Sequence, residues 1–95
     1  MLYAVICTDK PDSLAVRQTN RPQHVAYLEG LGSKLKAAGP FLDEAGDPTG
    51  SLVIIEAETR AEAEAAAALD PYAKAGVFAH VEVRPWKWTL RNPEG

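Results

Sequence analysis

Residues 69–77 read Leu-Asp-Pro-Tyr-Ala-Lys-Ala-Gly-Val and join an alanine-rich helix to the longest strand-like segment of the chain. Asp70 ends the helix, because a residue before a proline is pushed out of the helical region. Pro71 suits the first position of a new short turn, and Gly76 suits the left-handed conformation that closes it. Tyr72 brings a ring and a hydroxyl to the same corner. The segment predicts a rigid junction that holds a carboxylate, and taken alone Asp70 reads most simply as a turn residue.

The segments on either side of this junction are a helix and the last strand. Thr59 and Glu62 have the spacing of a capping box, so the helix is expected to follow them. Its alanines favour helix and let the backbone lie close to a sheet. The last strand is expected over residues 79–90. One of its faces carries His80, Glu82, Arg84, Trp86 and Trp88.

Two segments nearer the N-terminus are apolar on both faces. Residues 2–8 and 51–57 show this pattern, which is typical of central strands covered on each side. Residues 40–42 predict a short edge strand, because proline is tolerated at an edge. A polar turn over 43–50 connects that strand to the one after it. These segments therefore predict a hairpin.

The first helix is expected to begin near Asn20, which suits an N-cap, and to end at Gly39. Counting back four positions along the apolar stripe places His24 in the first turn, on the inward face. The stripe consists of Leu28, Leu31, Leu35 and Ala38.

The element order is βαββαβ, the ferredoxin-like arrangement of an α+β domain. We expect one domain over residues 1–95, with a four-stranded antiparallel sheet and two helices on one face. The other face then has no cover from this chain. An exposed apolar face of that size predicts a partner, and a symmetric homodimer is the simplest source of one.

Composition narrows the function classes. A net charge of −3 with mixed signs argues against a nucleic-acid partner. The uncharged runs are too short to span a bilayer. No basic residues precede the first apolar run, so we expect no signal peptide. Cys7, the single cysteine, excludes an internal disulfide and favours a structural role and a reducing cytoplasm. We expect no metal, since no histidine pair has ligand spacing, and no cofactor, since no phosphate loop is present.

Several motifs together resemble the YCII-related (YciI-like) family, which belongs to the dimeric α+β barrel group that includes muconolactone isomerases. The resemblance implies a ferredoxin-like fold, a dimer and a site built on a histidine and an aspartate, here His24 and Asp70. One branch of the family is similar to dehydrochlorinases that act on chlorinated hydroxyquinols. The matching motifs lie at residues 3–13, 21–28, 38–40, 50–54, 70–77 and 84–86.

His24 and Asp70 are therefore the candidate catalytic residues, and Tyr72 and Phe41 are the candidate walls of a substrate pocket. A helix N-terminus disfavours imidazolium, whereas an ionised Asp70 favours it, so the sequence leaves the charge of His24 open. Two functions remain. One is an acid–base lyase or isomerase, dehydrochlorinase-like, for a small cyclic or aromatic compound. The other is a non-catalytic small-molecule binding or regulatory module on the same fold.

Overall fold

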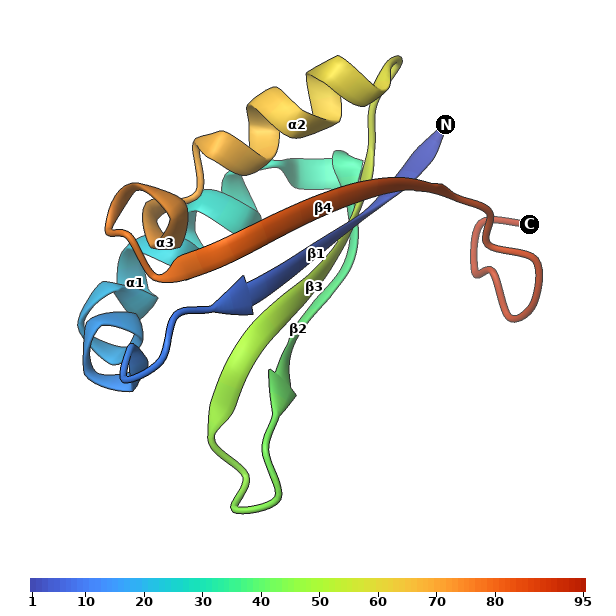
Figure 1. Ribbon diagram of the computed structural model, residues 1–95. Coiled ribbons are helices and arrows are strands. Elements are labelled where there is room, and N and C mark those ends of the chain that lie inside the picture. The colour runs from blue at the N-terminus through green and yellow to red at the C-terminus, as the bar shows by residue number, and fades with distance from the viewer.

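The computed structural model describes residues 1–95 as one four-stranded antiparallel sheet with its helices on one face (Figure 1). This is the predicted ferredoxin-like α+β fold. The strands are β1 (Leu2–Asp9), β2 (Leu35–Leu42), β3 (Pro48–Glu56) and β4 (Phe78–Trp86). The helices are α1 (Leu14–Gly30), a 3₁₀ turn η1 (Gly32–Lys34), α2 (Arg60–Ala68) and α3 (Pro71–Lys74). None of these helices is long and apolar enough to cross a membrane.

The strand order is β2-β3-β1-β4, so β1 and β3 occupy the centre of the sheet. Val5 of β1 lies opposite Val53 of β3 and Val83 of β4. These side chains are buried under the helices. The prediction that these two strands are central is confirmed, because each is hydrogen-bonded to a neighbouring strand along both edges.

The core lies between the sheet and the helices. Partly buried side chains of α1 and α2 complete it, and the close approach of α2 is possible because Ala63 is fully buried. The buried cluster consists of Tyr3, Val5, Cys7, Val53, Ile55, Ala57, Ala63 and Val83.

The predicted bounds of the first helix were wrong at both ends. The helix runs from Leu14 to Gly30, and Asn20 lies inside it, where its side-chain amide donates to the Val16 carbonyl at 2.9 Å. Pro22 is also inside the helix, although it removes one backbone hydrogen bond. Sequence reasoning placed a helix start at these two residues, because both are common there. Tertiary packing overrides that local preference.

The stripe that suggested a longer helix divides between two elements. Leu28 of α1 and Leu31, the C-cap of that helix, pack on the core. Leu35 begins β2, which is longer than the predicted strand over 40–42. Gly32, with φ of 59°, turns the chain between them. Gly39 lies within β2 and ends no helix.

The last strand ends at Trp86, short of the predicted end at Leu90. The C-terminal residues fold back as a tail, and Lys36 Nζ donates to Glu94 Oε1 at 2.9 Å. The tail therefore approaches the start of β2.

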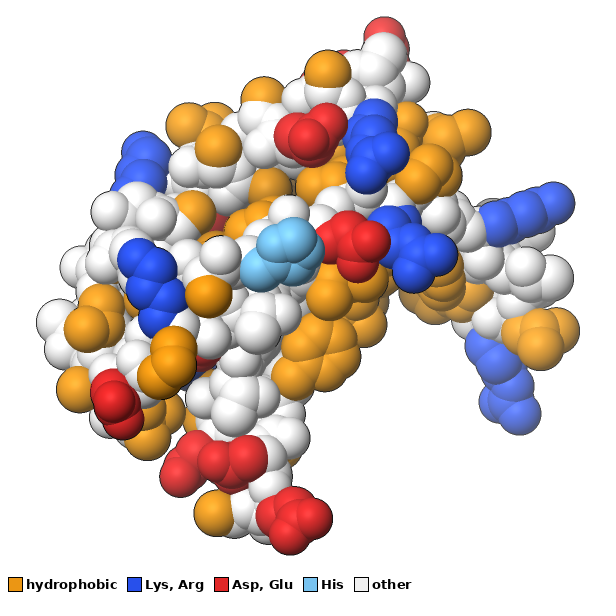
Figure 2. Space-filling view, in the orientation of Figure 1, with side chains coloured by type: hydrophobic (Ala, Val, Ile, Leu, Met, Phe, Trp, Pro, Cys, Tyr) orange, Lys and Arg blue, Asp and Glu red, His pale blue; other side chains and the backbone are white.

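The sheet face away from the helices has no cover from this chain. Hydrophobic side chains gather in its hollow, beside a row of charged ones (Figure 2). Leu52, Trp86 and Phe41 are each more than a third exposed. Strand alternation places Ala4 and Ile54 on the same face, where both are buried.

Candidate functional site

His24 and Asp70 come together although they are far apart in the sequence. His24 Nδ1 lies 2.8 Å from Asp70 Oδ1, and the two side chains are only 12% and 7% exposed. α1 supplies the histidine, and the junction between α2 and α3 supplies the aspartate. The sequence predicted this proximity. The chemical role of the pair remains a prediction.

The position of His24 within its helix differs from the prediction. Because α1 begins at Leu14, His24 lies well past the first turn. The argument that a helix N-terminus disfavours its charged form therefore does not apply, since the helix dipole acts within the first and last turns.

Asp70 is both the turn residue and the partner of the histidine. It is the N-cap of α3, and its Oδ1 accepts a hydrogen bond from the Tyr72 N–H at 2.9 Å. Pro71 occupies the first helical position. This capping bond fixes the carboxylate where it meets His24. The two readings of Asp70 from sequence are thus compatible.

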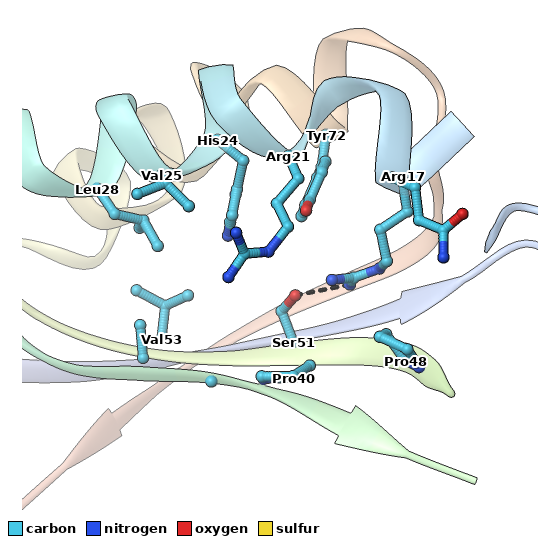
Figure 3. A pocket seen from close by; sticks show the side chains of 13 residues that line it. Arg17, Arg21, His24, Val25, Leu28, Pro40, Pro48, Ser51, Val53 and Tyr72 are labelled. Carbon is cyan, nitrogen blue, oxygen red and sulfur yellow. Dashed lines mark hydrogen bonds between the residues drawn. The ribbon is translucent and has the colours of Figure 1, made fainter. Parts of the chain in front are cut away.

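The contact with Asp70 sets how the imidazole can act. A neutral ring that donates its Nδ1–H to the carboxylate leaves Nε2 with a free lone pair. His24 lines a cavity and points from α1 towards the sheet (Figure 3). The geometry thus suits Nε2 to accept a proton from a molecule in that cavity.

Tyr72 holds the histidine ring from the side. The two rings are stacked with centroids 3.9 Å apart and planes 13° apart, and Tyr72 is only 1% exposed. The Arg17 guanidinium lies over the Tyr72 ring, 4.5 Å from its centroid, where a cation–π attraction is expected. Tyr72 is therefore held by partners from α1, and it restricts His24 in turn.

The Tyr72 hydroxyl faces the same cavity (Figure 3). Burial raises the pKa of this hydroxyl, although the charges of Arg17 and Arg21 act to lower it. A tyrosine with a raised pKa stays protonated at neutral pH. The hydroxyl is then available to donate a hydrogen bond to a bound oxygen atom.

A buried ion pair that sequence reasoning missed lies under one end of the cavity. Arg17 Nε donates to Asp9 Oδ2 at 2.8 Å, and its Nη2 donates to Asp9 Oδ1 at 3.1 Å and to Ser51 Oγ at 2.8 Å. Both charged side chains are 6% exposed. Helical spacing could have revealed Arg17. Once the helix begins at Leu14, Arg21 and Arg17 lie on the same face as His24.

The cavity measures about 240 Å³ and lies between α1 and the edge of the sheet formed by β2 and β3. This volume is below that of pockets for drug-sized ligands, so the cavity suits a smaller molecule. The lining residues include Arg17, Arg21, His24, Pro40, Ser51 and Tyr72.

Phe41, the second predicted wall residue, does not line this cavity. Pro40 lines it, and the neighbouring side chain of a strand points to the opposite face. Phe41 is 43% exposed and lines a shallow depression with Leu52. Strand alternation explains the difference, because it turns the Phe41 side chain away from the face that Pro40 lines.

Other polar groups do not assemble into a second candidate. His80 is exposed on β4, and no three residues among histidine, cysteine, aspartate and glutamate lie close enough to hold a metal ion.

Cys7 is buried in the core and is expected to be unreactive. Burial raises the pKa of its thiol from 9.0 to about 12; nearby Asp70 adds to this rise and Arg17 opposes it. We expect iodoacetamide to leave Cys7 unmodified at pH 8 in the folded protein and to modify it in urea, as mass spectrometry would measure. Cys7→Ala should keep any activity. Rapid labelling of the folded chain, or loss of activity with the fold intact, would contradict this role.

The thiol also links stability to pH. The unfolded chain releases the proton near pH 9, whereas the folded chain retains it to about pH 12. The contribution of Cys7 to the free energy of unfolding is therefore complete below pH 9 and falls as the pH rises from 9 towards 12.

Comparison with known proteins agrees with this architecture. Residues 1–87 match the YCII-related domain. The chain belongs to the YCII-related family. It is 44% identical over 95 residues to Protein YciI of Escherichia coli O6:H1, covering 92% of this chain and 97% of that protein.

Solved structures extend the comparison. The chain superposes with a TM-score of 0.85 and 40% identity on 5-chloro-2-hydroxyhydroquinone dehydrochlorinase (TftG) from Burkholderia phenoliruptrix, whose structure is a complex with 2,5-dihydroxybenzoquinone. The match covers 97% of this chain and 99% of TftG. An antibiotic biosynthesis monooxygenase matches with a TM-score of 0.56 and 17% identity, over 94% of this chain and 99% of the other. That second likeness concerns the fold alone.

Proposed function

We propose that this YCII-related protein is a cofactor-independent acid–base enzyme, a lyase or isomerase, that acts on a small cyclic or aromatic compound. The observation that carries the proposal is the 2.8 Å contact between His24 and Asp70 at a small cavity. A histidine oriented by a carboxylate is the arrangement that general-base catalysis uses.

His24 Nε2 accepts a proton from the bound compound, and Asp70 stabilises the imidazolium that forms. The Tyr72 hydroxyl donates a hydrogen bond to the substrate oxygen on which negative charge develops. In an elimination of hydrogen chloride, the electron pair of the broken bond to hydrogen forms the new double bond while chloride leaves with its own pair. In an isomerisation, the imidazolium returns the proton at another atom.

The similarity to TftG supports this proposal at the level of reaction class. At 40% identity over nearly the whole of both chains, a shared elimination chemistry is a reasonable inference. Fold alone would not support it, because one fold hosts many functions. We therefore extend to this chain the dehydrochlorinase-like class without extending the named substrate.

The experiment is a screen of purified protein against hydroxylated aromatic compounds, lactones and their chlorinated forms. Ultraviolet spectra would follow the ring, and a chloride electrode would follow elimination. Turnover that requires His24 supports the proposal. Saturable binding without turnover would overturn it and identify the chain as a binding or regulatory module.

The uncovered sheet face supports a second proposal, that the protein is a homodimer through this face. Leu52, Phe41 and Trp86 are exposed there, and large exposed apolar surfaces mark interaction sites. A second copy would cover the face with the same surface, as two-fold symmetry allows.

Light scattering at micromolar concentration is expected to give twice the 10.2 kDa mass of the chain. Leu52→Arg places a charge on the face and should yield monomers. Ala61→Arg, at an exposed position of α2, should leave the dimer intact. A folded wild-type monomer, or dissociation of both variants alike, would contradict the dimer.

A further inference from the structure

The charged side chains that line the cavity are all basic or histidine. Arg17, Arg21 and His24 line it, and no aspartate or glutamate does. Asp9 and Asp70, the carboxylates that contact Arg17 and His24, are not part of the lining. The charge that the lining presents to a ligand is therefore positive, which favours an anionic ligand.

The two arginines differ in whether their charge is already compensated. Arg17 is buried and makes two hydrogen bonds to the Asp9 carboxylate and one to Ser51. Its charge is thus paired with Asp9, and its guanidinium also lies over the Tyr72 ring. Arg17 is therefore part of the scaffold of the site.

Arg21 has no carboxylate partner. The structure contains three ion pairs, Arg17–Asp9, His24–Asp70 and Lys36–Glu94, and Arg21 takes part in none of them. Nor does its guanidinium make a side-chain hydrogen bond. Arg21 is an exposed residue whose side chain lines the cavity and points from α1 towards the sheet (Figure 3).

Arg21 is also close to the groups of the proposed reaction. It lies three positions before His24, on the same face of α1. Its positive charge acts to lower the pKa of the Tyr72 hydroxyl, which places it within electrostatic reach of that group. A ligand oxygen between these residues would meet a guanidinium and a hydroxyl donor.

We propose that Arg21 is the specificity-determining residue of the site, and that it selects small ring compounds bearing an anionic oxygen, a carboxylate or an ionised acidic hydroxyl. The inference rests on the proposed function for the identity of the site. Arg21 donates charge-assisted hydrogen bonds to the anion, which are the stronger kind and suit guanidinium geometry. A neutral ring of the same shape leaves that guanidinium unpaired.

The test uses benzoate and benzamide, which have the same ring and nearly the same shape but differ in charge. Isothermal titration calorimetry at low ionic strength would measure both affinities for the wild-type protein. We expect benzoate to bind about 10- to 100-fold more tightly than benzamide, the range for a hydrogen bond to a charged group. Added salt should reduce the difference, because the ligand charge is partly screened.

Matched variants identify the residue. Arg21→Gln should remove the preference for benzoate, Arg21→Lys should keep part of it, and Arg60→Gln on exposed α2 should leave it unchanged. Circular dichroism would confirm the fold of each variant. Equal binding of the two probes, no benzoate binding at millimolar concentration, or a preference that survives Arg21→Gln would each overturn the inference.

His24→Ala separates this inference from the proposed function. If the charge preference persists in His24→Ala while turnover is absent from the wild type, the anion site stands and the acid–base proposal fails. If turnover requires His24 but benzoate has no advantage, the proposed enzyme stands and the role of Arg21 fails.

Discussion

His24→Ala is expected to lower turnover by roughly 100- to 10,000-fold, the usual contribution of a positioned proton-transfer group. The imidazole is the only side chain at the cavity with both a free ring nitrogen and a carboxylate behind it. The measurement is kcat on the substrate that the screen identifies, with a thermal melt to verify the fold. His80→Ala removes the other histidine, which is exposed on β4, and should leave kcat nearly unchanged.

Asp70→Asn refines this prediction. The amide oxygen can still accept from the Tyr72 N–H, so the cap of α3 is retained. The negative charge that stabilises an imidazolium is lost, and kcat should fall with little change in stability. A kcat for His24→Ala close to wild type, with Asp70→Asn equally active, would leave Asp70 as a turn residue only.

Arg17→Met is expected to lower the free energy of unfolding by about 3–5 kcal/mol, the cost of breaking a buried pair from one side. The Asp9 carboxylate, 6% exposed, would lose its bidentate partner and stay buried. Ser51 would lose its hydrogen bond from Arg17 as well. Urea unfolding would measure the change. By the usual scaling for a domain of this size, the melting temperature should fall by at least about 12 °C.

Two controls separate burial from charge. Lys36→Met breaks the pair with Glu94, which is 57% exposed, and should cost only about 0–1 kcal/mol. The double variant Arg17→Met with Asp9→Leu should recover much of the lost stability, because no unpaired charge then remains. If the two single variants lose equal stability, the pair between Arg17 and Asp9 is not a buried one in solution.

Local chemistry determined the parts of this protein that sequence reasoning located correctly. The N-cap at the start of α2 is formed, with Thr59 Oγ1 accepting from the Glu62 N–H at 3.1 Å. Asp70 caps α3, and Gly76 has the expected positive φ of 78°. These features depend on residues within a few positions of one another. The central position of β1 and β3 was likewise predictable from their two-sided apolarity, which is typical of central strands.

The proximity of His24 and Asp70 was also predictable, because the order of the elements and the helical phase of His24 bring them to one edge. The phase survived although the start of the helix was wrong, since a helix has the same period wherever it begins. The predicted influence of the helix dipole on His24 was wrong, because it depends on the distance of the residue from the helix end.

Only the tertiary structure decided where α1 gives way to β2 and which side chains complete the site. Leu28, Leu31 and Leu35 fit a helical stripe, yet Leu35 begins β2 and pairs with Ile55, 20 positions along the chain in β3. Arg17, Asp9 and Ser51 meet for the same reason. Local propensities amount to tenths of a kcal/mol per residue, whereas burial and ion pairing across the fold amount to several, so the long-range contacts prevail.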